Sequence, residues 1–157
     1  MKTKQLNISY LEFSSLDELP ADDKELALAA IGAMKGAYAP YSNFIVGSAV
    51  RLEDGTIVTG ANQENAAFPS GLCAERTAMF SAGAAYPDKA MVSIAIAGGS
   101  GGVLDASPAS PCGACRQVMA QYQTKGGKKM SIIMVGNGRI LKFYRVDDLL
   151  PFIFNNI

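Results

Sequence analysis

The chain has 157 residues, with 14 basic and 14 acidic side chains, a net charge of zero, three cysteines and no histidine. Its length predicts a single domain, and a composition that is 49% hydrophobic and 18% charged argues against disorder. Neutral net charge provides no broad attraction to nucleic acid or to an anionic membrane, so we expect neither as a partner. The lack of histidine excludes Ser-His-Asp and Cys-His catalysis and any zinc site with an imidazole ligand.

The N-terminal residues 1–20 are predicted to form an extended arm ahead of one domain, residues 21–157, because polar and apolar side chains alternate along them. They lack the apolar core of a signal peptide. No stretch reaches the roughly 18 consecutive apolar residues of a transmembrane helix. An odd number of cysteines is unlike a secreted disulfide framework. These features predict a cytoplasmic protein with reduced thiols.

The first helix is predicted to start after Pro20, with an acidic first turn, and to end near Gly36 and Pro40. Turns at 53–55 and 136–138 predict two hairpins. The alternation of elements predicts an α/β fold, a three-layer α/β/α sandwich on a five-stranded mixed sheet whose last two strands form an antiparallel hairpin. After the first helix we expect, in chain order, strands at Ile45–Leu52 and Thr56–Ala61, a helix at about 72–82, a strand at Met91–Ala97, a helix at about 113–123, strands at Ser131–Val135 and Ile140–Tyr144, and a short helix near Val146–Leu150.

The three cysteines open two of these helices. Cys112 and Cys115 are spaced i and i+3 and share one helix face, so they can bind a single ion, with Cys73 as a third sulfur from the other helix. Thiolates are favoured at helix N-termini. A closed structural zinc site takes four Cys or His ligands, so here the fourth position falls to a carboxylate, another chain or water. Three protein ligands and one water are typical of catalytic zinc.

Two plainer interpretations stand beside this one. A single cysteine such as Cys73 is usually a small buried apolar side chain. The Cys112–Cys115 spacing alone is also that of a thioredoxin-like redox pair. Such a pair usually faces a proline from a later loop, and no proline lies between Cys115 and Pro151. The two cysteine clusters together favour the metal site.

Several strings in the chain resemble the zinc-dependent cytidine deaminases, in particular the small homotetrameric type. The similarity extends over residues 21–155, and a three-cysteine variant of the zinc site occurs among such deaminases. The resemblance implies that the protein hydrolyses cytidine and 2′-deoxycytidine to uridine and 2′-deoxyuridine plus ammonia, in pyrimidine salvage. It also implies a homotetramer whose active sites are completed by neighbouring subunits. The strings are AYAPYSNF at 37–44, NQENA at 62–66, CAERTA at 73–78, SPCGACRQ at 110–117 and LLPFIF at 149–154.

The resemblance also implies a role for individual residues. One zinc ion per chain is bound by Cys73, Cys112 and Cys115, and Glu75 carries protons between water, the pyrimidine N3 and the leaving amine. Three thiolates and Zn²⁺ together carry one net negative charge, which Arg76 can offset by donating hydrogen bonds to the sulfurs. The plainer interpretations are a solvated surface glutamate for Glu75 and an ordinary surface ion pair for Arg76. The position of Glu75, two residues after a candidate ligand, argues against the first.

The substrate is expected to lie between the zinc site and two loops. By resemblance, Phe44 packs against the ring, Asn62 and Glu64 bind the ribose 3′-OH, the Ala74 N–H helps to hold the pyrimidine, the Pro111 carbonyl faces the departing ammonia, and Phe154 closes the site from a neighbouring subunit. Taken alone, the polar residues are loop side chains and the phenylalanines are core. One departure is Phe68, where family members commonly carry a tyrosine, so the hydroxyl is missing.

Other functions share parts of this pattern. Nucleic-acid and nucleobase deaminases usually carry His-x-Glu and continue with a helix after the fourth strand, whereas this chain has Cys-x-Glu and a predicted hairpin. A deaminase of a cytosine-nucleoside antibiotic such as blasticidin S remains an alternative. A catalytically silent, zinc-stabilised interaction module is another, although the intact Glu75 argues against it.

Overall fold

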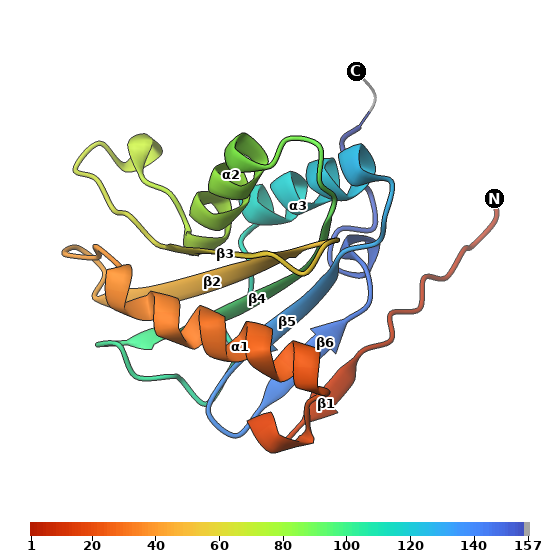
Figure 1. Cartoon of the computed structure of the whole chain (residues 1–157). Coiled ribbons are helices and arrows are strands. Elements are labelled where there is room, and N and C mark those ends of the chain that lie inside the picture. The colour runs from red at the N-terminus through yellow and green to blue at the C-terminus, as the bar shows by residue number, and fades with distance from the viewer. Residues whose placement is uncertain (156–157) are drawn as a thin grey trace.

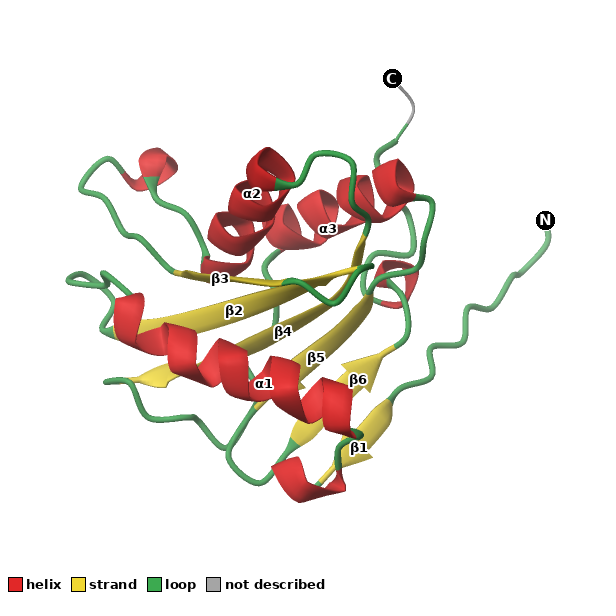
Figure 2. Ribbon diagram, viewed as in Figure 1, coloured by secondary structure: helices red, strands yellow, loops and turns green. Residues whose placement is uncertain are grey.

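One mixed β-sheet lies between α1 on one face and α2 and α3 on the other (Figures 1 and 2). The computed structural model describes residues 1–155. Short 3₁₀ turns occupy Leu16–Glu18, Met34–Gly36, Phe68–Ser70 and Val146–Asp148. The helices and strands are β1 (Leu11–Phe13), α1 (Ala21–Ala33), β2 (Phe44–Leu52), β3 (Ile57–Ala61), α2 (Ala74–Ala85), β4 (Met91–Ser100), α3 (Gly113–Gly126), β5 (Ser131–Val135) and β6 (Ile140–Phe143). The predicted three-layer α/β/α sandwich is confirmed.

The sheet has six strands in the order β1-β6-β5-β4-β2-β3, so the predicted number of five was wrong. Among the neighbouring strands of residues 1–155, β4 and β5 form the one parallel pair, and β5 and β6 form the predicted antiparallel hairpin. The additional strand, β1, comes from the segment predicted as an arm, with Leu11 opposite Lys142 and Phe13 opposite Ile140. A three-residue strand whose partner lies at the other end of the chain carries too little local pattern to be recognised.

Two apolar layers hold the sandwich together. The central strand β4 is buried along nearly its whole length, as its continuous apolar run predicted. On one face of the sheet, Leu26 and Ala30 of α1 pack onto the layer that includes Ile133. On the other face, Met79 of α2 and Met119 of α3 share the second layer. The positions of the helices are therefore set by burial against the sheet.

Close contact between α2 and β3 fixes where α2 begins. A Cβ atom on Gly60 of β3 would lie 2.4 Å from the backbone nitrogen of Ala78, so only glycine lets the helix approach this closely. The α2 helix then begins at Ala74, directly after Cys73, and α3 begins at Gly113, directly after Cys112. The N-termini of α2 and α3, where the sequence predicted the metal ligands, thus belong to helices that pack on the sheet.

Candidate active site

The three cysteines meet where α2 and α3 begin. Cys73 is the N-cap residue of α2 and Cys112 that of α3, whereas Cys115 lies within the first turn of α3. The Sγ atoms of Cys73 and Cys112 are 3.8 Å apart, and those of Cys112 and Cys115 are 3.5 Å apart. All three sulfurs lie within 4.8 Å of one another. The structure therefore brings together the three side chains predicted as metal ligands.

This sulfur cluster fits the dimensions of a zinc site. Sulfurs bound at about 2.3 Å in tetrahedral geometry lie about 3.8 Å from one another, close to the distances found here. Cys115 is buried and Cys112 is exposed. Cys73 and Cys112 border a cavity, so one side of the cluster is open. The donor set fits one zinc ion per chain, in the three-ligand arrangement typical of catalytic zinc.

Two of the three thiols have shifted pKa values. Hydrogen bonding from Cys115, and further from Arg76, lowers the pKa of Cys73 to about 5. The same hydrogen bond to Cys73, together with burial, raises the pKa of Cys115. Zinc binding requires thiolates, so it must release the remaining thiol protons, and the affinity for zinc falls as the pH is lowered.

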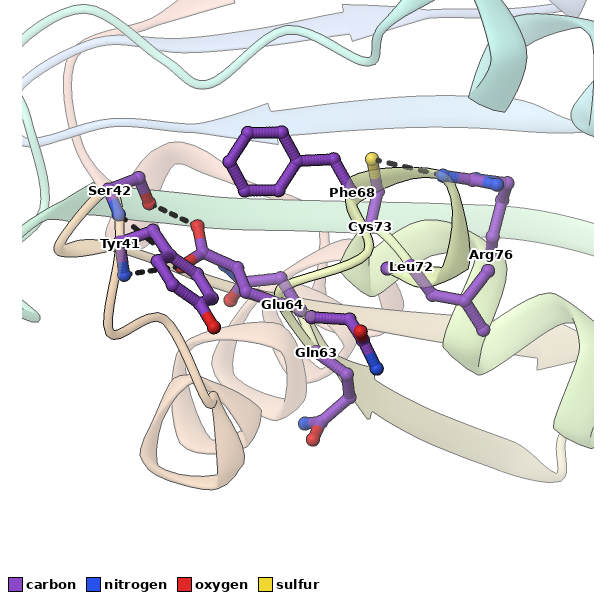
Figure 3. Close-up of a pocket in the computed structure, with 11 residues that line it drawn as sticks. Tyr41, Ser42, Gln63, Glu64, Phe68, Leu72, Cys73 and Arg76 are labelled. Carbon is purple, nitrogen blue, oxygen red and sulfur yellow. Dashed lines mark hydrogen bonds between the residues drawn. The ribbon is translucent and has the colours of Figure 1, made fainter.

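Arg76 provides positive charge beside the sulfurs. Its Nη2 lies 3.7 Å from the Cys73 Sγ, and Figure 3 shows the guanidinium pointing toward that sulfur. The buried Nε of Arg76 has no hydrogen-bond partner among the described residues. It also forms no ion pair with a carboxylate in the part of the chain that the structure describes. The side chain is therefore placed to offset the charge of the thiolates.

Glu75 lies beside the sulfur cluster and is only 4% exposed. Burial is the main reason that the pKa of its carboxyl is raised to about 7. Such a carboxyl can both accept and release a proton near neutral pH, as a general acid and base must. The residue is not a solvated surface glutamate.

A cavity of about 310 Å³ connects this cluster with the polar loops, and several predicted residues meet there. A second hollow of about 460 Å³ continues it outward and shares Ser42, Asn62, Glu64 and Cys73 with it. Cavities of this size take a small molecule. The predicted site residues in the wall of the first cavity are Phe44, Asn62, Glu64, Cys73, Ala74, Glu75 and Cys112.

Glu64 is held at the far end of the cavity by the loop that precedes β2. The Ser42 Oγ donates to Glu64 Oε1 over 2.5 Å, and the Tyr41 N–H donates to Oε2 over 2.8 Å. Figure 3 shows the carboxylate pointing toward Ser42. These hydrogen bonds, first that from Ser42, hold the pKa of Glu64 below its usual range. Glu64 is therefore an acceptor with a fixed orientation.

Asn62 is fixed by the backbone of β2. The Val46 N–H donates to Asn62 Oδ1 over 2.9 Å, and Asn62 Nδ2 donates to the Phe44 carbonyl over 2.8 Å. An amide nitrogen carries two hydrogens, so one donor of Asn62 remains for a ligand. The pair Asn62 and Glu64 thus offers a donor and an acceptor side by side.

Two predicted substrate-binding residues, Pro111 and Phe154, are not in the wall of either hollow, and neither is the buried ligand Cys115. The Pro111 carbonyl accepts a hydrogen bond from Arg116 Nε over 2.8 Å. Phe154 is 68% exposed and its backbone is bound by Gln117. Sequence reasoning assigned no role to Ser42, Arg116 or Gln117. All three lie inside the quoted strings, but their partners are set by the tertiary structure.

Phe68, at the position where the resemblance led us to expect a tyrosine, lines the outer hollow. It is 74% exposed and packs edge-to-face on Tyr41, with ring centroids 5.8 Å apart. Leu72 also lines this hollow. The outer wall is therefore largely apolar and open to solvent on a single chain.

Comparisons with known proteins agree with this site. The family model for the cytidine and deoxycytidylate deaminase zinc-binding region matches residues 20–130. The chain is 45% identical over 135 residues to a cytidine deaminase of Halalkalibacterium halodurans, which covers 83% of this chain and 92% of that protein. A crystal structure of cytidine deaminase from Burkholderia pseudomallei matches with a TM-score of 0.72 and 41% identity, over 83% of this chain and 97% of that one. One from Mycobacterium tuberculosis matches with a TM-score of 0.68 and 34% identity, over 87% and 99%.

Proposed function

This chain belongs to the cytidine deaminase family, and on that premise we propose that it hydrolyses cytidine and 2′-deoxycytidine to uridine and 2′-deoxyuridine plus ammonia. One observation carries the proposal. The wall of a single cavity combines Glu75 and two of the clustered cysteines, Cys73 and Cys112, with the polar side chains of Asn62 and Glu64. A cytosine nucleoside offers a group for each set of residues: an exocyclic amine on its base for the cysteines and Glu75, and hydroxyls on its sugar for Asn62 and Glu64.

The protein side of the reaction centres on Glu75. The chemistry that a bound zinc ion supplies is the activation of water, with Cys73, Cys112 and Cys115 as its ligands. The Glu75 carboxylate accepts a proton from the attacking water as the oxygen bonds to C4. It gives this proton to N3, then takes the remaining proton from the new C4 hydroxyl and passes it to the exocyclic amine, so the C4–N bond breaks, ammonia leaves and C4 becomes a carbonyl. The raised pKa of Glu75 suits both directions of transfer.

The remaining residues bind and orient the nucleoside. Asn62 donates to the 3′-OH through its free Nδ2 hydrogen, and the Glu64 carboxylate accepts from it. Phe44 packs against the pyrimidine ring. The Ala74 N–H, at the start of α2, holds the pyrimidine, and a free lone pair of the Pro111 carbonyl receives the departing amine. Correct orientation of substrate and acid–base group accounts for a large part of such a rate enhancement.

The same proposal includes a homotetramer in which Phe154 of one subunit closes the site of another. Two features support it. Phe154 is exposed and lies outside the cavity wall of its own chain, and the outer hollow exposes Tyr41 and Phe68. No described helix is long and apolar enough to cross a lipid bilayer. We place the enzyme in the cytoplasm, because a reducing compartment keeps the three zinc-binding thiols unoxidised.

A spectrophotometric assay tests this function with cytidine, deoxycytidine, cytosine and cytidine monophosphate, with zinc measured in the same samples. We expect absorbance loss with the two nucleosides only, and a fall of about 10³–10⁴-fold in kcat for Glu75→Gln with zinc retained. Reaction of cytosine or the monophosphate but not cytidine would show that the sugar assignment of Asn62 and Glu64 is wrong. Zinc without any deamination would favour a silent binding module.

A further inference from the structure

Gln117, on the second turn of α3, binds the C-terminal tail through both ends of its carboxamide. Its Nε2 donates to the Phe154 carbonyl over 2.7 Å, and the Phe154 N–H donates to its Oε1 over 3.3 Å. A single side chain thus forms the pair of hydrogen bonds that a neighbouring strand would otherwise form. Such a pair fixes the backbone at Phe154.

The rest of the tail is anchored to the same helix. The Arg116 guanidinium donates to the Leu149 carbonyl over 3.0 Å and to the Pro111 carbonyl over 2.8 Å. Ile153 packs against the apolar layer beneath α2 and α3. The tail is therefore tied to the helix that begins at Cys112.

The Phe154 side chain itself is not held by its own chain. It is 68% exposed, and Phe152 two residues before it is 91% exposed. Neither ring lines the cavity or the outer hollow of the same chain. The anchored tail thus presents aromatic side chains outward, while the outer hollow presents the exposed rings of Tyr41 and Phe68. A second copy of this chain carries the same two features, an exposed aromatic tail and an outer hollow with exposed rings.

We propose that Gln117 is a positioning residue that acts between subunits, by holding the tail so that Phe154 reaches the nucleoside bound to a second copy of the chain. This inference rests on the proposed function. Gln117 does not line the cavity, and among the described residues its side-chain hydrogen bonds are to the Phe154 backbone, so its effect on substrate passes through that backbone. Without the two hydrogen bonds, the tail must be ordered each time substrate binds, which weakens binding.

The first experiment is a double-mutant cycle on steady-state kinetics. We expect Gln117→Ala to raise KM for cytidine about tenfold, equivalent to the ~1.4 kcal/mol of a pair of net hydrogen bonds, with kcat within about twofold and zinc retained. In a Phe154→Ala background, Gln117→Ala should have no further effect on KM, because its target side chain is gone. Unchanged KM in the single variant, or additive effects in the double variant, would overturn the proposal.

Two further variants of α3 serve as controls for this experiment. Gln117→Glu keeps the size of the side chain but replaces the Nε2 donor with an acceptor facing the Phe154 carbonyl, so KM should rise at least as much. Gln121, an exposed glutamine on the same helix, has no partner in the Phe154 backbone, and Gln121→Ala should leave KM unchanged. Equal effects of the substitutions at 117 and 121 would indicate a general weakening of α3 and contradict a specific role.

Subunit mixing tests whether the effect passes between copies. Gln117→Ala chains are co-expressed with Glu75→Ala chains, and the mixed oligomers are purified with two different tags. An intact Glu75 is then present only in chains that carry Gln117→Ala. In a mixed oligomer, some of these active sites receive the tail of a neighbouring Glu75→Ala chain, in which Gln117 is intact. Activity with the wild-type KM should reappear. A KM that stays raised would show that Gln117 acts within its own chain. If the wild-type protein does not deaminate cytidine, the proposed function itself is wrong, which is a separate outcome.

Discussion

The two ends of the active-site cavity are held in place by different physical means. At the zinc end, Cys73 and Cys112 occupy helix N-termini, and both helices are packed on the sheet by buried side chains. At the sugar end, Glu64 lies on a loop and is oriented by hydrogen bonds from Ser42 and Tyr41. Packing thus positions the groups proposed to react, and polar contacts between loops position the groups proposed to bind the sugar.

This difference predicts different responses to substitution. Because the zinc end is coupled to the core, its loss should affect stability together with catalysis. Because the residues assigned to the sugar, Asn62 and Glu64, are half-buried and held by a few hydrogen bonds, their loss should affect KM and leave the fold intact. The following predictions run from the largest expected effect to the smallest.

Removal of a metal ligand should abolish activity and destabilise the protein. In Cys115→Ser, a buried sulfur ligand is lost, so zinc content should fall and the Tm should drop by about 10 °C, given about 2–4 °C per kcal/mol for a chain of this length. Metal analysis, activity and a thermal melt measure the three effects. Wild-type protein treated with a chelator should behave similarly and recover when zinc is added. A stable, active Cys115→Ser protein would contradict the role of this ligand.

The pH dependence of stability should reveal the buried Glu75 carboxyl in metal-free protein. Its pKa is raised to about 7 from 4.5, so between these values the native state binds a proton that the unfolded state has lost. Stability from this group is therefore full below about pH 4.5 and falls as the pH rises to about 7, by about 3 kcal/mol. Denaturant unfolding of wild-type and Glu75→Gln proteins across this range measures it. Parallel curves for the two proteins would show that the carboxyl is not perturbed.

Loss of the Ser42 hydroxyl should weaken binding of the sugar and leave the chemistry intact. Without its hydrogen bond to Glu64, Ser42→Ala should raise KM for cytidine about tenfold, with kcat and Tm nearly unchanged. Ser42→Thr keeps the hydroxyl and is the matched control. For 2′,3′-dideoxycytidine, which lacks the 3′-OH, Ser42→Ala should make no difference. An equal rise in KM for both substrates would place the defect elsewhere in the pocket.

Removal of the first nine residues should affect neither end of the cavity. These residues are exposed and precede β1, so deletion of 1–9 should change stability by less than about 0.5 kcal/mol and leave KM unchanged. Deletion of 1–15 also removes β1 and the ion pair between Glu12 and Arg139, and should lower the Tm. Equal Tm values for the two deletions would show that β1 adds no stability.

The zinc end of the site was predictable from the sequence because its signals are local. Cys73 and Cys112 each precede a helix, Cys115 follows at the spacing of one helix face, and the lack of histidine restricts the ligand set to sulfur, carboxylate or water. Helix starts and side-chain spacing within a helix depend on neighbouring residues, so one sequence suffices to recognise them. The five sequence motifs that resemble the cytidine deaminases then indicated the reaction.

The tertiary structure alone decided the contacts between distant segments. β1 pairs with β6 across nearly the whole chain, Ser42 meets Glu64 from another loop, and Gln117 meets Phe154 from the tail. The local sequence around these residues does not indicate which distant residue each one contacts, because the packing of the sheet and helices decides which segments lie together. The sequence indicated which groups we propose to carry the chemistry, and the packing of the folded chain determined which residues hold them in position.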